Sequence, residues 1–331
     1  MASPIDERAG AGLPANAADL VALGQPVVLR GLAAGWPIVR AGDPAAYLRR
    51  FAGDTPVDVA VGAPEFGGRL FYTADLAGLN FVKERSTVGA VLDRLAAAAD
   101  AARPPAIAAQ AVTVREALPG FAEENRLTLF DRDLAPRIWI GNRIVVATHH
   151  DMASNVAVVA AGRRRFTLFP PDQVGNLHIG PLEFTPAGTP VSLVDLDAPD
   201  LDRFPRFAEA LRHARTAELA PGDAIYIPHM WWHHVRSLDP LSVLVNYWWS
   251  EAAAPQPGLA PVDAMIHALL AFDGLPDEQR AAWRAMFDQL VFDDDPDALA
   301  AVPPERRGIR GALDENAKAR LRRQLGRMMA S

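Results

Sequence analysis

The chain has 331 residues, a formal net charge of −7 and no cysteine. This length allows one large domain or two ordinary ones, with a sizeable buried core in either case. The lack of cysteine excludes disulfides, thiolate zinc sites, iron–sulfur clusters and cysteine nucleophiles. Any metal ion must therefore bind imidazole and carboxylate groups, and the acidic charge gives no sign of a nucleic-acid partner.

Two further patterns bear on where the protein works. The N-terminal segment MASPIDERAGAG carries acidic residues and no apolar run, which is not the pattern of a secretory signal peptide. No run of apolar residues is long enough to cross a bilayer as a helix. We therefore expect a cytoplasmic protein that does not bind membranes.

The first part of the chain is expected to form a flexible arm, residues 1–15, followed by a β-rich domain, residues 16–258. Asp43 and Thr87 are each placed to cap the start of a helix. Period-two alternation and turn signals predict strands at these segments: Val27–Arg30, Val57–Val61, Leu70–Tyr72, Arg137–Ile140, Ile144–Thr148, Asn155–Ala160, Arg164–Phe169, Ala224–Ile227, His234–Leu238 and Ser242–Trp249.

Beyond Pro261 the pattern changes from alternation to the spacing of amphipathic helices. Helices are predicted to start at Val262, to span Asp277–Leu290 and to span Asp314–Met329. We therefore expect residues 259–331 to be a separate helical region. Because symmetric homodimers are common, we expect this region to pair two copies of the chain rather than to cap the β-rich domain.

The strongest sign of chemistry is the sequence ATHHD. On a strand, residues two apart point to the same face, so His149 and Asp151 project together and His150 projects to the other side. One imidazole and one carboxylate make two-thirds of a facial triad. The third ligand is expected from the segment PHMWWHHV, where the uncertain strand start leaves both His233 and His234 as candidates.

A face of two histidines and one carboxylate leaves three coordination positions open. This arrangement suits non-haem Fe(II), which binds a cosubstrate and then dioxygen. A zinc site more often has three or four protein ligands in a closed or nearly closed arrangement. The pattern therefore favours iron.

An arginine is predicted to share the inward face with these ligands. If residues 161–162 form a two-residue hairpin turn, Arg164 falls on the same face as His149. A buried arginine near a metal needs an anionic partner, and a dicarboxylate would supply one through a bidentate contact. Asn155 and Asn246 have inward parity as well, and ligand oxygens or ordered water would satisfy them.

At these residues the chain resembles the Jumonji-C (JmjC) and cupin-like (cupin-8) oxygenases that depend on Fe(II) and 2-oxoglutarate. It looks closest to the group of the hypoxia-inducible-factor asparaginyl hydroxylase. The resemblance covers residues 147–249, where the THHD strand, LFPPDQ, the WWHH segment and VNYWW follow the family's order. It implies a mainly β fold, in which a double-stranded β-helix (jelly-roll or cupin) core carries flanking helices and a C-terminal helical tail.

The resemblance also implies the iron ligands. In the family, the histidine directly after the paired tryptophans binds iron, and His233 stands there in this chain. His149 and Asp151 match the His-x-Asp motif. Together, these three residues are implied as the metal ligands and the catalytic centre.

The contacts to 2-oxoglutarate are implied in the same way. Arg164 stands where the family has a lysine for the distal carboxylate, and Val146 stands where it has a threonine. Tyr72 matches a tyrosine that contacts the same carboxylate. Asn155 and Asn246 match asparagines near the cosubstrate and the metal. The carboxylate site is therefore expected to differ from the family pattern, with Arg164 as its main cation.

The implied activity is that of a 2-oxoglutarate-dependent dioxygenase, which hydroxylates a protein or peptide side chain and releases succinate and CO₂. N-methyl demethylation by the same chemistry is an alternative. A cupin metalloenzyme without 2-oxoglutarate, such as an isomerase or a simple dioxygenase, is another, and a non-catalytic cupin that binds a peptide or a sugar is a third. The expected partners are a protein, peptide or small-molecule substrate and a second copy of the chain.

Overall fold

The computed structural model describes residues 2–131, 133–250, 260–293, 295–311 and 313–329. The chain divides into two compact units, residues 1–253 and residues 254–331. The predicted boundary after residue 258 lies in the segment 251–259, outside the described residues.

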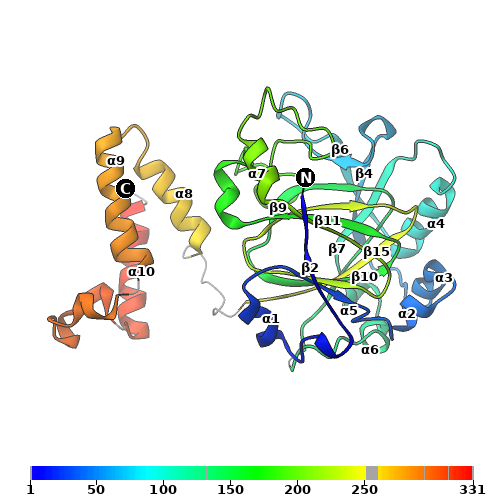
Figure 1. The fold of residues 1–331 in the computed structure, drawn as a ribbon, viewed down its shortest axis with the longest axis horizontal. Helices are drawn as coiled ribbons and strands as arrows, with labels where there is room; N and C mark the ends of the chain where they lie inside the picture. Colours follow the sequence, from blue (N-terminus) through cyan, green and yellow to red (C-terminus); the bar gives the residue numbers. More distant parts are fainter. Residues whose placement is uncertain (1, 132, 251–259, 294, 312, 330–331) are drawn as a thin grey trace. The chain divides into compact units, whose positions relative to one another are not determined.

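The larger unit is built on two β-sheets (Figure 1). The six-stranded sheet has the spatial order β1 (Ser3–Pro4), β12 (Arg215–Leu219), β11 (Arg164–Phe169), β14 (Trp232–Ser237), β9 (Val145–His150) and β5 (Arg69–Leu70). The nine-stranded sheet has the order β2 (Asp6–Ala9), β3 (Val27–Arg30), β13 (Ala224–Ile227), β10 (Ser154–Ala161), β15 (Ser242–Trp249), β8 (Arg137–Gly141), β7 (Ala106–Thr113), β4 (Val57–Gly62) and β6 (Phe81–Ser86).

Apolar side chains from both sheets form a common core between them. Val28, Ile225 and Leu244 of the nine-stranded sheet pack in one cluster with Phe166 and Val235 of the six-stranded sheet. The other face of the nine-stranded sheet packs against helices in a second cluster, so every residue of β10 is buried. Two facing sheets of this kind confirm the mainly β, jelly-roll expectation.

Short helices cover the outer face of the nine-stranded sheet. They are α1 (Ala17–Leu23), α2 (Pro37–Arg40), α3 (Pro44–Arg49), α4 (Val88–Ala98), α5 (Val114–Ala117) and α6 (Phe121–Glu124), and α7 (Phe207–His213) lies on the other side of the unit. Both predicted caps are confirmed, because Asp43 accepts a hydrogen bond from the N–H of Ala46 at 3.0 Å and Thr87 accepts one from Ala90 at 3.3 Å.

The N-terminal segment is not the flexible arm that the sequence predicts. In the structure, β1 pairs in parallel with β12 and β2 pairs in parallel with β3, so residues 3–9 join both sheets. Ile5, between the two strands, is 2% exposed and belongs to the core between the sheets. The prediction failed because the exposed residues here are polar, and backbone pairing rather than apolar alternation specifies these strands.

The predicted hairpin at residues 161–162 is also wrong. β10 pairs with β13 and β15, whereas β11 pairs with β12 and β14, so the chain crosses from one sheet to the other at this point. Gly162 makes the crossing with φ +65°, and a Cβ there would overlap the carbonyl oxygen of Leu241. Only glycine tolerates both conditions without strain.

Several strands differ from their predicted bounds. β5 ends at Leu70, and Tyr72 forms only an isolated bridge with Leu79. β14 begins at Trp232, which places His233 inside the strand. The sequence predicted neither β6 nor β7, because β6 is a charged edge strand and β7 is rich in alanine, a residue of low strand propensity.

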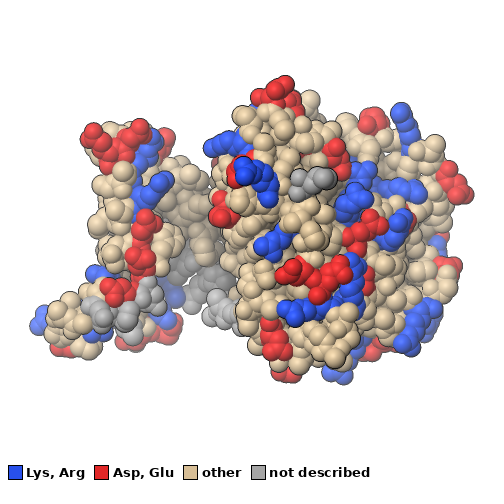
Figure 2. Space-filling model, viewed as in Figure 1, with Lys and Arg blue, Asp and Glu red and all other residues tan. Residues whose placement is uncertain are grey.

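Charged side chains of both signs are interspersed on the visible face of the larger unit (Figure 2). Ion pairs also lie around the crossing at Gly162. Arg163 pairs with Asp239 at 3.1 Å and with Glu218 at 3.3 Å, and Arg165 pairs with the same Glu218 at 3.4 Å. These contacts account for the outer arginines of the sequence RRR and leave the middle one, Arg164, to be explained.

The smaller unit is helical, as predicted. It contains α8 (Pro261–Ala271), α9 (Asp277–Phe287) and α10 (Glu315–Met329). Phe272, just after α8, contacts the rings of Trp283 and Phe287 on α9. Among the described residues of both units, no helix combines the length and the apolar character needed to cross a membrane.

Candidate metal and cosubstrate site

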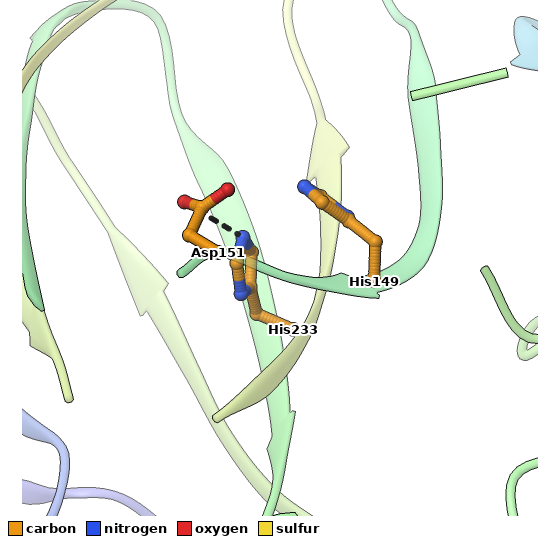
Figure 3. A group of neighbouring side chains, drawn as sticks. All are labelled: His149, Asp151 and His233. Atoms are coloured by element: carbon orange, nitrogen blue, oxygen red, sulfur yellow. Dashed lines mark ion pairs between the residues drawn. The ribbon is translucent and has the colours of Figure 1, made fainter. Parts of the chain in front are cut away.

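The two histidines and the aspartate singled out in the sequence come together on facing strands. β9 carries His149 and is followed directly by Asp151, and β14 carries His233, whose Cα is the register partner of His149. One candidate ligand atom from each residue lies within 4.8 Å of the other two. Figure 3 shows the three side chains converging on one space, as a metal ion would require.

Both histidines are held in the tautomer that a metal ligand needs. The Nδ1 atom of His149 is 2.8 Å from the carbonyl oxygen of Ala147, and the Nδ1 atom of His233 is 3.1 Å from that of Trp231. A carbonyl oxygen only accepts, so each Nδ1 carries the proton and each Nε2 keeps a free lone pair. In both cases the acceptor lies two residues earlier on the same segment.

The electrostatic environment favours the ligand forms of these groups. Burial, followed by the neighbouring charge of His233, lowers the pKa of His149 to about 4. Burial raises the pKa of Asp151, but His233, His149 and the indole N–H of Trp248 outweigh it and hold that pKa below its usual value. At neutral pH, His149 is therefore uncharged and Asp151 is ionised, as metal binding requires.

The other histidines of the two motifs lie outside this group. His150 points to the opposite side of β9, where its ring meets Trp232 at a centroid distance of 4.6 Å. His234 is buried, and that burial lowers its pKa to about 4. The structure thus groups His233, and not His234, with His149 and Asp151.

A cavity of about 340 Å³ opens from these three residues into the space between the sheets. Arg164 lies at its wall, 2% exposed, together with the apolar residues Val146, Phe166 and Leu244. The inward position of Arg164 agrees with the prediction, although the hairpin used to predict it does not exist. It faces inward because β11 lies in the opposite sheet, with its first residue turned toward the cavity.

Arg164 lacks an anionic partner among the described residues. Its Nε atom donates to the Oγ of Ser242 at 2.8 Å, and its buried Nη2 atom has no hydrogen-bond partner. Burial lowers its pKa to about 9, and no neighbouring carboxylate counteracts this effect. A buried guanidinium with an unused donor facing a cavity is the chemistry expected of a carboxylate-binding site.

Two predicted asparagines also line the cavity. Asn246 donates to the Oδ1 of Asn155 at 3.0 Å, and Asn155 in turn donates to the Oδ2 of Asp151 at 3.4 Å. The buried Oδ1 of Asn246 has no partner in the described part of the chain. The pair therefore connects the aspartate to a polar atom that is free to accept from a ligand or from water.

Tyr72 is the one predicted contact residue that lies apart from the others. It does not line the cavity; its hydroxyl donates to the carbonyl oxygen of Phe184 at 2.7 Å. The ring of Phe184 lies 5.9 Å from that of Tyr72. This contact fastens the loop whose next residues, 186–188, form part of the cavity wall.

Sequence reasoning missed several residues of the cavity wall. Trp139 and Trp248 line it as an edge-to-face pair with a centroid distance of 5.2 Å. Gln110 lines it from a bulge in β7, where Ala111 adopts φ +50° and its carbonyl accepts from Arg137 at 2.9 Å. The tryptophan pair of the segment VNYWW was a usable signal for Trp248, but nothing in the alanine-rich β7 pointed to Gln110.

A comparison with known protein families shows to which family the chain belongs. A family described as the cupin-like domain matches residues 14–254. The chain belongs to the cupin-like domain family. This match covers almost all of the larger unit and includes every candidate ligand described above.

Curated proteins with similar sequences carry several names. The chain is 35% identical over 113 residues to human HSPB1-associated protein 1, which is 34% of this chain and 22% of that protein. It is 27% identical over 231 residues to lysine-specific demethylase 8 of Xenopus tropicalis, covering 68% and 48%. It is 30% identical over 146 residues to chicken tRNA wybutosine-synthesizing protein 5, covering 40% and 43%.

The chain thus spans less than half the length of these relatives. One of these names is that of a demethylase, which supports a JmjC or cupin-like oxygenase, a family that typically uses Fe(II) and 2-oxoglutarate. The names do not single out the asparaginyl hydroxylase group that the sequence motifs resemble. The family is therefore established, whereas the substrate is not.

Proposed function

We propose that the chain is an Fe(II)- and 2-oxoglutarate-dependent oxygenase that hydroxylates a protein or peptide side chain. One observation carries this proposal: a triad of His149, Asp151 and His233 shares a cavity with Arg164, whose buried Nη2 atom has no partner. The donor set fits Fe(II), and the unsatisfied guanidinium fits a dicarboxylate cosubstrate. A cytoplasmic location and a homodimer remain part of this proposal.

Each residue has a distinct task under this proposal. The Nε2 atoms of His149 and His233 and the carboxylate of Asp151 would hold the iron. Bound iron supplies the activation of dioxygen, while 2-oxoglutarate supplies electrons and leaves as succinate and CO₂. Arg164, oriented by its bond to Ser242, would hold the distal carboxylate of the cosubstrate in the cavity.

The remaining wall residues would restrict access to the reacting atoms. Val146, Phe166 and Leu244 keep the neighbourhood of Arg164 apolar, which strengthens its contact with an anion. Trp139 and Gln110 lie on a different part of the wall and are available to a substrate side chain. The protein thus binds, orients and excludes water, and the oxidising chemistry belongs to the cofactor.

The direct test is succinate formation from 2-oxoglutarate with added Fe(II). We expect turnover in the wild-type protein and none in Asp151→Ala, because loss of the only carboxylate ligand removes the metal site. Asp58→Ala, which alters another carboxylate of the cavity wall, is the matched control and should still bind iron. Metal-dependent turnover that survives in Asp151→Ala would refute the ligand assignment.

The relatives named demethylases favour a second candidate, N-methyl demethylation. Both reactions insert oxygen into a C–H bond, so the cavity alone does not separate them. Peptide products heavier by one oxygen atom support hydroxylation, whereas formaldehyde together with a product lighter by one methylene group supports demethylation. A cupin enzyme that does not use 2-oxoglutarate would form no succinate under any of these conditions.

A further inference from the structure

Trp248 contacts the candidate metal site directly, although the sequence motifs assign it no role. Its indole Nε1 donates to the Oδ2 of Asp151 at 3.0 Å. This is shorter than the 3.4 Å contact from Asn155 to the same oxygen. The indole also forms part of the cavity wall, so one side chain borders both the metal ligand and the space for ligands.

The sheet fixes where this indole lies. Asn246 and Trp248 are two residues apart on β15 and therefore share its inward face. The Cα of Trp248 is the register partner of Asn155 on β10, four residues after Asp151 in the chain. The ring of Trp139 packs edge-to-face against the indole at 5.2 Å, which restricts its rotation.

The aspartate needs an external anchor more than the histidines do. Each histidine is oriented by a carbonyl oxygen two residues earlier on its own segment. Asp151 comes after the last residue of β9, and the N–H of Met230 donates to its carbonyl oxygen at 3.1 Å. That bond does not fix the rotation of the carboxylate, so a side-chain donor must do so.

An indole suits this purpose because it can only donate. Its N–H cannot reverse its role or bind the metal, so the contact with Asp151 has a single possible polarity. Partners of this kind orient metal ligands in protein sites, and their loss weakens metal binding. We infer that Trp248 is a positioning residue that fixes the carboxylate of Asp151 for metal coordination. This inference rests on the proposed role of Asp151 as a ligand.

The test is the dissociation constant of Co(II) alone, measured from its d–d absorption bands in Trp248→Phe. Phenylalanine keeps an aromatic ring in the wall and removes the N–H donor. We expect Co(II) binding to weaken by about 10- to 100-fold, with altered absorption bands because the ligand geometry changes. Trp249→Phe is the matched control: it removes the next indole on β15, whose ring packs against Phe130 and Tyr226 outside the cavity wall, so the Co(II) affinity should change by less than about 3-fold.

The outcomes separate this inference from the proposed function. Equal Co(II) affinity in wild type and Trp248→Phe would overturn the positioning role while leaving the metal site intact. Equal weakening in Trp249→Phe and Trp248→Phe would overturn it too, because the effect would then come from the packing of β15. Unchanged Co(II) binding in Asp151→Ala would instead overturn the proposed metal site.

A second measurement applies if Trp248→Phe does not fold. In ¹H–¹⁵N spectra of the wild-type protein, an indole N–H that donates to a carboxylate should resonate downfield of the other tryptophan indoles. We expect this signal to move upfield in Asp151→Ala, which keeps Trp248 and removes its acceptor. An indole spectrum that does not change in Asp151→Ala would show that the bond is absent in solution and would overturn the inference.

Discussion

At the scale of single residues, Arg164 is the most informative position. It is a buried cation, and its only side-chain hydrogen bond within the described residues goes to a neutral hydroxyl, that of Ser242. A buried charge without a counter-charge costs stability, and the described residues offer no compensation. The packing of the described residues therefore does not account for this charge, whereas the proposed role in binding an anion does.

This leads to a prediction about stability. Arg164→Met should raise the thermal stability of the ligand-free protein by on the order of 1 kcal/mol, because a side chain of similar length removes the buried charge. The same variant should lose the stabilisation that 2-oxoglutarate gives to the metal-loaded wild type. Thermal unfolding with and without the cosubstrate measures both effects.

Arg165→Met is the matched control for this prediction. Arg165 is the next residue, points outward and pairs with Glu218 at the surface. Its loss should leave stability nearly unchanged, because exposed ion pairs contribute little, and should leave the response to 2-oxoglutarate intact. A lower stability of ligand-free Arg164→Met would contradict the view that this charge is held for a ligand.

The positions of some single site residues could be predicted from the sequence, and those of others could not. Strand parity correctly places His149 and Asp151 on one face, because two-residue periodicity survives any uncertainty about strand pairing. It could not choose between His233 and His234, because that choice depends on where β14 begins. The contact of Trp248 with Asp151 was not predicted, because Asp151 follows a strand of the other sheet and parity within one strand says nothing about such contacts.

At the scale of elements, the N-terminal strands are held by charge as well as by pairing. Arg30 on β3 donates from Nε to Glu7 on β2 at 3.0 Å and from Nη1 to Asp223 at 2.6 Å. The hydrogen bond from Arg30 is the main cause that lowers the pKa of Glu7. Glu7 therefore stabilises the folded state in its ionised form.

The stability of this element should depend on pH in a defined direction. The pKa of Glu7 is lower in the folded than in the unfolded chain, so its contribution is present above the unfolded value and is lost as the pH falls through the folded value. We expect Glu7→Gln to be less stable than wild type at pH 7 in urea titrations. The difference should shrink once the pH falls below about 4, near the ordinary glutamate pKa.

Glu65→Gln serves as the control, because Glu65 forms no ion pair in the described part of the chain and lies at the surface. It should track the wild type at every pH. A stability difference between Glu7→Gln and wild type that grows as the pH falls would contradict the expected direction.

Elements were predicted well where one face is apolar and poorly where it is not. The strands Arg164–Phe169, Ala224–Ile227 and Ser242–Trp249 appear with the predicted bounds. β1 and β2 were missed because their side chains are mostly exposed and polar. Strands of that kind form because they pair with strands distant in the sequence, and these partners cannot be predicted from local composition.

At the scale of the whole molecule, the helical unit has much apolar surface. Leu270 of α8 is 76% exposed and Phe292, after α9, is 72% exposed. Exposed apolar side chains at this density are typical of a surface that associates. The homodimer expected from the sequence therefore remains a prediction with a physical basis in this unit.

We expect light scattering to give a dimer for the wild-type protein and a monomer for the double variant Leu269→Asp, Leu270→Asp. Two carboxylates on an apolar contact surface would have to be buried without partners, which opposes association. Val82→Asp is the control, because Val82 is also well exposed but lies on β6 of the other unit. A wild-type protein that is monomeric at micromolar concentration would contradict the predicted homodimer.

The fold class was the most predictable property of the whole molecule. Many short strands followed by amphipathic helices leave few architectures, and the structure has the expected one. The division of strands between two sheets was not predictable, because a crossing such as the one at Gly162 has the same local signature as a hairpin turn. One glycine with positive φ is compatible with both.

That glycine has a consequence for how such a protein can diversify. The crossing at Gly162 ties the two sheets together where Arg164 begins β11, and no other residue fits beside Leu241. The backbone that leads into Arg164 is therefore fixed at this point. In loop 186–188, by contrast, Ala187 borders the cavity and is exposed, so its side chain can change without disturbing the core. Under the proposed function, substitutions at Ala187 would alter the space for the substrate, while the backbone beside Arg164 stays the same.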